Sequence, residues 1–142
     1  MIRMQEEEWR AFISEGTRTG KLATVRSDGR PHTVPIWFIF DGVDLIFMTG
    51  DTTVKVQNIR REPRVAIAVD EEQFPYSFVT IEGIATIHEL SPAELLPYSV
   101  DIAQRYVGEE QAAQFGARNA VEGEVLIRVR PTKVISAKDL AD

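Results

Sequence analysis

The sequence predicts a fold that is mainly β or α+β, with an antiparallel, barrel-like core and peripheral helices. About six segments combine β-branched and aromatic residues with bounding turn signals, which is typical of strands. These segments do not alternate regularly with helices, as the strands of a parallel sheet would. With 142 residues and an apolar content of 44%, the chain is long enough to bury one core, so we expect a single domain over residues 1–142.

The N-terminal part is expected to form a helix and then a β-hairpin. Apolar residues recur at helical spacing between Gln5 and Glu15, and Gly16 follows as a stop signal. Residues 22–25 and 33–40 have strand patterns on either side of Asp28-Gly29, a dipeptide that supplies the positive φ of a tight turn. The helix should therefore cover one end of a sheet that starts with this hairpin.

A second turn, at residues 41–44, leads into the next strand at 45–48. Three consecutive strands would then form an antiparallel meander. The pattern changes to helical at residues 54–59, and Pro63 ends this helix before a strand at 65–69.

The C-terminal half adds two strands and two helices. A long strand carries Gly83 in its middle, which often marks a bulge or a close backbone approach. Ser91 and Glu94 form a capping box that opens a helix reaching to about Tyr106. The remaining predicted elements are a polar loop at 71–77, the long strand at 78–88, a helix at 109–115, and a strand at 125–129 that ends at a Pro131 turn.

The composition excludes several classes of function. The net charge of −6 and a pI near 5.0 argue against non-specific nucleic-acid binding, which needs many Lys and Arg contacts to phosphates. The absence of cysteine excludes disulfides, thiolate nucleophiles and Cys-based metal sites. No apolar run approaches the roughly 18 residues that would span a bilayer. We expect a cytoplasmic protein that binds neither nucleic acid nor membranes.

The segment from Thr49 to Arg61 has the features of an anion-binding site. It follows a strand and opens a helix, so free backbone amides lie near hydroxyls and the cations Lys55, Arg60 and Arg61. The same charges could also belong to a solvated helix face and pair with neighbouring carboxylates. These residues alone leave both interpretations open.

The strand at 33–40 is apolar on both sides of its alternation, so both of its faces should be covered. One face would meet the core, and the other a ring system or a partner subunit. Pro35 removes one backbone donor, which indicates a local edge or bulge. The alternative is an ordinary buried strand with Trp37 in a dimer interface.

Metal and hydrolase chemistry have little support. His32 and His88 lie in different predicted strands without the spacing of a metal site, so we expect no metal. No serine occupies a Gly-x-Ser-x-Gly elbow. His32 is either a hydrogen-bonded strand residue or a catalytic one.

Several ordered motifs give the chain a family resemblance. They are Gly20-Lys21-Leu22-Ala23-Thr24-Val25, Asp28-Gly29-Arg30-Pro31-His32, Pro35-Ile36-Trp37-Phe38, Asp41-Gly42, Phe47-Met48-Thr49 and the segment from Lys55 to Val65. In this order they resemble the pyridoxamine 5′-phosphate oxidase-like proteins, and in particular their branch of probable F420-dependent oxidoreductases. The resemblance implies the FMN-binding split β-barrel fold and a homodimer with two cofactor sites at the subunit interface.

The resemblance also implies which residues bind the cofactor. Its phosphate would be held by Thr53 and Lys55, with Asn58, Arg60 or Arg61 nearby. Its ring would lie along Pro35, Ile36 and Trp37 and near Thr49, and loop residues 73–76 would approach from the other subunit. An arginine that relatives often carry just before Lys55 is replaced here by Thr53 and Val54, so phosphate binding would depend more on Lys55.

The function implied is hydride transfer from reduced F420 to an unknown small-molecule acceptor. The alternatives are an FMN-dependent oxidoreductase of the same fold and a non-catalytic protein that binds a flavin or haem. If a side chain donates a proton, Tyr76 and His32 are the candidates, with solvent as an equal alternative. The chain ends without the C-terminal Arg and His residues of pyridoxamine phosphate oxidases, which argues against vitamin B6 oxidation.

Overall fold

The computed structural model describes residues 1–142 and consists of one seven-stranded sheet and four helices. In chain order the elements are α1 (Glu6–Ser14), β1 (Gly20–Val25), β2 (Pro31–Ile36), β3 (Ile39–Phe40), β4 (Leu45–Gly50), α2 (Val54–Arg61), β5 (Arg64–Glu71), β6 (Ser77–His88), α3 (Pro92–Val107), α4 (Glu109–Asn119) and β7 (Glu124–Ala137). This confirms the predicted α+β fold.

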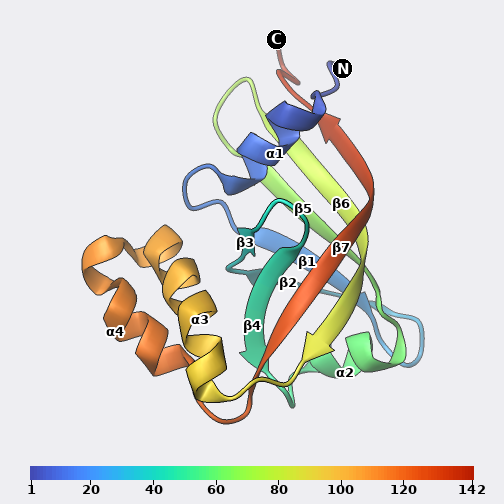
Figure 1. The fold of residues 1–142 in the computed structure, drawn as a ribbon. Coiled ribbons are helices and arrows are strands. Elements are labelled where there is room, and N and C mark those ends of the chain that lie inside the picture. The colour runs from blue at the N-terminus through green and yellow to red at the C-terminus, as the bar shows by residue number, and fades with distance from the viewer.

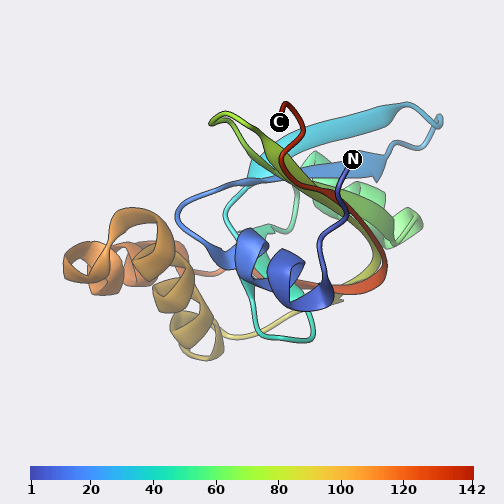
Figure 2. The ribbon, with the colours of Figure 1, turned by 90° about the horizontal axis from the view of Figure 1, so that it is seen from above.

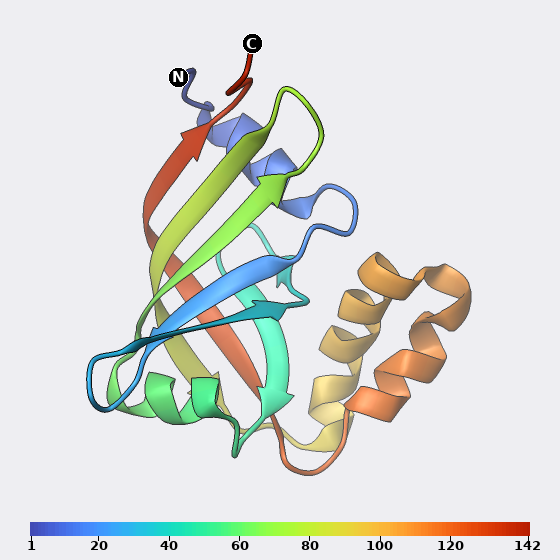
Figure 3. The same ribbon diagram turned by 180° about the vertical axis from the view of Figure 1, so that it is seen from behind.

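All strand pairs are antiparallel, and the strand order is β2-β1-β5-β6-β7-β4-β3. The sheet curls into a half-barrel, with α1 near one end and α2 near the other (Figures 1 and 3). The α3–α4 hairpin stands to one side of the sheet, as Figure 2 shows from above. None of the four helices combines the length and apolar character needed to cross a membrane.

The core inside the curled sheet fixes the position of both end helices. Ile13 of α1 and Val56 of α2 are fully buried in it, together with Phe38 and Phe47 from the sheet side. Burying a side chain of this size stabilises the fold by about 1.5–3 kcal/mol. The start of α2 is therefore held firmly against the end of the barrel.

A second, smaller apolar cluster attaches the helical hairpin to the outside of the sheet. Leu95 of α3 and Ala120 at the end of α4 pack with Ile46 of β4 and Leu126 of β7. The predicted capping box starts α3, because the Ser91 hydroxyl accepts a hydrogen bond from the Glu94 amide. The hairpin thus lies beside the outer face of β4.

The predicted strand at 33–40 is interrupted, which is a correction to the sequence interpretation. β2 ends at Ile36, and β3 begins only at Ile39. Between them Phe38 turns into the core, and its backbone bonds to side chains of α3 instead of to a strand. The predicted meander is wrong for the same reason, since β2 lies at one end of the strand order and the β3–β4 pair at the other.

The prediction that Pro131 ends the last strand is also wrong. β7 continues through Pro131 to Ala137, because the β6–β7 register shifts between Glu82 and Gly83 at this point. A bulge tolerates a residue without an amide donor.

The predicted close approach at Gly83 is confirmed, since a Cβ there would lie 2.6 Å from the carbonyl oxygen of Arg130. The hairpin at Gly29, with φ of 88°, is confirmed as well.

Candidate functional site

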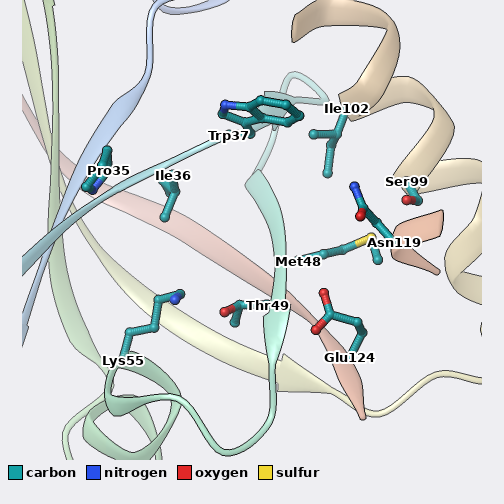
Figure 4. Close-up of a pocket in the computed structure, with 10 residues that line it drawn as sticks. All are labelled: Pro35, Ile36, Trp37, Met48, Thr49, Lys55, Ser99, Ile102, Asn119 and Glu124. Carbon is teal, nitrogen blue, oxygen red and sulfur yellow. The ribbon is translucent and has the colours of Figure 1, made fainter. Parts of the chain in front are cut away.

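A cavity of about 290 Å³ lies between the end of β2, β4, the start of α2 and the α3–α4 hairpin (Figure 4). Its lining residues are Pro35, Ile36, Trp37, Met48, Thr49, Lys55, Ser99, Ile102, Asn119 and Glu124. The sequence interpretation named Pro35, Ile36, Trp37, Thr49 and Lys55 as cofactor-binding residues, and the structure brings them together here.

Trp37 forms a fixed aromatic platform at this cavity. Its ring stacks on Tyr106 of α3, with centroids 5.0 Å apart and planes at 5°. The Tyr106 hydroxyl accepts from the Phe38 amide at 3.2 Å and donates to the Arg18 carbonyl at 2.9 Å. Trp37 itself remains 41% exposed. Because Tyr106 holds one side of the indole, the exposed side is available for stacking by a planar ligand.

Arg105 holds the chain around this platform in place. Its guanidinium donates to the carbonyls of Ile13 at 2.8 Å, Gly16 at 2.9 Å and Phe38 at 2.7 Å, with a longer bond to Arg18 at 3.3 Å. Burial lowers the pKa of Arg105, and no carboxylate pairs with it. The interruption between β2 and β3 is thereby tied to α3 and to the segment after α1.

Lys55 is a cation without an internal partner. It is the second residue of α2, and its ammonium group makes no hydrogen bond and no ion pair within 4.0 Å. Burial lowers the pKa of Lys55, and Glu124 offsets part of this effect. The first intrahelical bond of α2 runs from the Gln57 amide to the Thr53 carbonyl, so the amides of Val54, Lys55 and Val56 have no partner within the helix, whereas the Thr53 amide donates to the Gly50 carbonyl. Together these groups form an anion-binding arrangement.

Glu124 is a cavity residue that the sequence interpretation missed. It begins β7 and pairs with Gly50 of β4. Burial raises the pKa of the Glu124 carboxyl; Lys55 lowers it and Asp51 raises it further. Its neighbours Ser99, Ile102 and Asn119 come from the helical hairpin, whose position beside β4 follows only from the tertiary packing.

Four predicted phosphate-binding residues make other contacts. The Thr53 hydroxyl donates to the Gly50 carbonyl at 2.8 Å, within the turn that precedes α2. The other three, Asn58, Arg60 and Arg61, contact residues outside the cavity and hold α2 in position. Asn58 is buried and donates to the Thr24 hydroxyl at 2.9 Å, and Arg61 donates to the Asn58 side-chain oxygen at 3.2 Å.

Arg60 pairs with Glu89 just after β6, at 3.8 Å. None of Thr53, Asn58, Arg60 and Arg61 lines the cavity. Of the three cations predicted together, only Lys55 points into it (Figure 4).

The two candidate proton donors lie away from the cavity within one chain. His32 lies opposite Thr24 in the β1–β2 strand pair, and the Nδ1 atom of its ring is buried without a hydrogen-bond partner. Tyr76 lies in the β5–β6 loop, packs edge-on against Phe74 and is 44% exposed. This loop is at the end of the molecule that carries the termini, opposite α2 (Figures 1 and 3). No group of three or more His, Asp or Glu side chains is arranged to hold a metal ion.

The fold defines a split β-barrel protein, and its cavity places an unpaired cation beside an aromatic platform. A family model described as pyridoxamine 5′-phosphate oxidase matches residues 5–137, and the chain belongs to this family.

Solved structures agree with this assignment. The chain is 29% identical to the conserved hypothetical protein Rv2991 from Mycobacterium tuberculosis, with a TM-score of 0.83, covering 99% of this chain and 90% of that one. It is also 29% identical to an F420 reductase, with a TM-score of 0.69 and coverage of 88% and 94%. HutZ, the haem storage protein from Vibrio cholerae, is 19% identical with a TM-score of 0.71 and 94% coverage of both chains, and this likeness shows the fold alone.

Proposed function

We propose that this protein is an F420-dependent reductase that passes a hydride from the reduced deazaflavin to a small-molecule acceptor. The observation that carries the proposal is the cavity itself, in which an unpaired, partly buried cation stands beside a fixed aromatic platform. The similarity to an F420 reductase, at 29% identity over 88% of this chain, favours a deazaflavin over other planar ligands.

The residues present fit the phosphate of such a cofactor. A partly buried ammonium without a counter-ion is unfavourable, so an anion at Lys55 would stabilise both partners. The free amides at the start of α2 form the positive end of the helix dipole, which also favours binding of an anion. Lys55 would therefore bind the phosphate, with Thr53 shaping the turn through its bond to Gly50.

The residues of the β2 end would hold the ring. Pro35 offers an apolar surface above the largely buried Ile36, and Trp37 offers a stacking face that Tyr106 keeps in one orientation. When bound, the deazaflavin supplies the hydride chemistry. The protein's own part is to fix the ring plane, to exclude water from one side and to orient the acceptor above it.

We further propose a homodimer with the two cofactor sites at the subunit interface. The cavity of about 290 Å³ lies at the lower limit for small-molecule sites, roughly 300–1,000 Å³, so one chain would supply only part of the site. The outer face of β1, β5 and β6 carries Ala23, Ala66 and the exposed Ile84 together with the charged Arg64 and Glu82. Phe74, 70% exposed, and Tyr76 would then reach the cofactor only from the second subunit.

FMN is the second candidate, because the anion-binding corner recognises a phosphate whichever ring is attached to it. A non-catalytic flavin- or haem-binding protein would bind its ligand without turnover. Anaerobic mixing of the protein with chemically reduced F420 and a quinone, an enone or a nitroarene distinguishes an F420-dependent reductase from a protein that only binds the cofactor. We expect protein-dependent return of the oxidised F420 absorbance, which Lys55→Ala should slow. Bound F420 that is never oxidised faster than in free solution would contradict a reductase.

A further inference from the structure

Glu124 places a carboxylate in a cavity otherwise suited to an anion. Its side chain points into the cavity from the wall on the β7 side, and Lys55 points in from the α2 side (Figure 4). The two groups are not in contact, since no ion pair joins them within 4.0 Å, and the Glu124 carboxylate makes no hydrogen bond. A partly buried carboxylate without a donor is costly, so its presence here needs an explanation.

The charges around Glu124 are few. Lys55 on α2 attracts the Glu124 carboxylate, and Asp51, in the turn before α2, repels it. The cavity side chains from β4, α3 and α4, which are Met48, Thr49, Ser99, Ile102 and Asn119, carry no charge. Lys55 and Glu124 are the two charged residues of the cavity lining, so the protonation state of Glu124 strongly affects whether the cavity attracts or repels an anion.

We propose that Glu124 sets the pH dependence of anion binding in this cavity. Its ionised form opposes a phosphate at Lys55, whereas its protonated form removes that repulsion and can donate a hydrogen bond to the phosphate. The inference rests on the proposed function, because it assumes that the cofactor presents an anionic group. Because burial raises the pKa of Glu124, the protonated form persists to higher pH than it would for an exposed glutamate.

Two consequences follow from linkage. Binding of a phosphate stabilises protonated Glu124, so the complex takes up a proton in the pH range where Glu124 titrates. Affinity for phosphate ligands should therefore fall as the pH rises through that range. Inorganic phosphate and FMN titrate in the same range, which changes their repulsion from an ionised Glu124, whereas sulfate keeps its charge there and isolates the titration of Glu124.

The test compares wild-type protein with Glu124→Gln, which keeps the shape and removes the charge. F420, FMN, inorganic phosphate and sulfate are titrated separately at about pH 8, where an ordinary glutamate is ionised, and at about pH 5.5, which is closer to the ordinary pKa of a glutamate. The backbone amide NMR shifts at the start of α2 report binding of each anion. We expect Glu124→Gln to bind about tenfold more tightly at the higher pH, and the advantage to shrink at the lower pH. Glu122→Gln, at an exposed position of the same turn, is the matched control and should change nothing.

An equal or lower affinity of Glu124→Gln at the higher pH, or an advantage of the same size at both pH values, would overturn the inference. If neither cofactor binds while inorganic phosphate still shows the expected ratio, the proposed function fails and the role of Glu124 stands. If no anion binds at either pH, both proposals fail.

Discussion

Replacing Arg105 by methionine should destabilise the protein by about 3 kcal/mol and should also loosen the aromatic platform. Three of its bonds to backbone carbonyls are 2.7–2.9 Å long, and each contributes about 1 kcal/mol net. Methionine keeps an apolar chain next to Phe38, whose ring lies 4.6 Å from the guanidinium carbon. The substitution therefore removes the hydrogen bonds while preserving most of the packing.

Urea unfolding at a fixed protein concentration measures this loss. Arg118→Met on α4 is the matched control, because Arg118 is exposed, lies over the Phe115 ring and makes no hydrogen bond, and it should change the unfolding free energy by less than about 1 kcal/mol. In a Trp9→Phe background, Trp37 emission should shift to longer wavelength in Arg105→Met as the indole becomes more exposed. Equal unfolding free energies for the two arginine variants would refute the role assigned to Arg105.

Three other substitutions test the site and the sheet. Lys55→Ala should weaken cofactor binding by about 1.5–3 kcal/mol, roughly 10- to 100-fold, and an unchanged dissociation constant would remove Lys55 from the site. Gly83→Ala should lower the unfolding free energy by about 1–3 kcal/mol, because its Cβ would lie 2.6 Å from the Arg130 carbonyl oxygen; an unchanged melting temperature would contradict the close approach. Tyr106→Phe keeps the stacking on Trp37 and removes the hydroxyl's bonds, so urea unfolding should report a loss of about 1 kcal/mol, and a gain in stability would argue against those bonds.

The elements that could be predicted from the sequence carry their signals locally. The Asp28-Gly29 turn needs only a residue with positive φ, and the Ser91–Glu94 capping box needs only two side chains three residues apart. Gly83 is a similar case, since the absence of a Cβ already indicates a bulge or a close approach.

The two strand errors have a different origin, because both depend on distant parts of the chain. The break after Ile36 is stabilised by Arg105 and Tyr106, which lie nearly seventy residues further along and reach the Phe38 backbone only after α3 has docked. The passage of β7 through Pro131 depends on a bulge opposite Gly83 in another strand. The strand propensity of the local sequence alone therefore predicts neither of these features.

The family resemblance named some of the residues that line the cavity. Trp37, Thr49 and Lys55 meet at the cavity as that resemblance implies. Asn58 and Arg61 lie further along α2 and contact β1 or each other, so their closeness in sequence to Lys55 does not bring them to the cavity. Glu124 could not be found without the strand order that pairs β7 with β4.

The most direct test of the proposed cofactor site is a parallel titration of Trp9→Phe protein with F420 and with FMN, monitored by the fluorescence of Trp37. Stacking of a deazaflavin on the indole should quench this emission, with F420 binding more tightly than FMN and Lys55→Ala weakening both. Tighter binding of FMN would move the assignment to a flavin-dependent oxidoreductase of the same fold. Absence of quenching by both cofactors would contradict the claim that the cavity at Trp37 and Lys55 is a cofactor site.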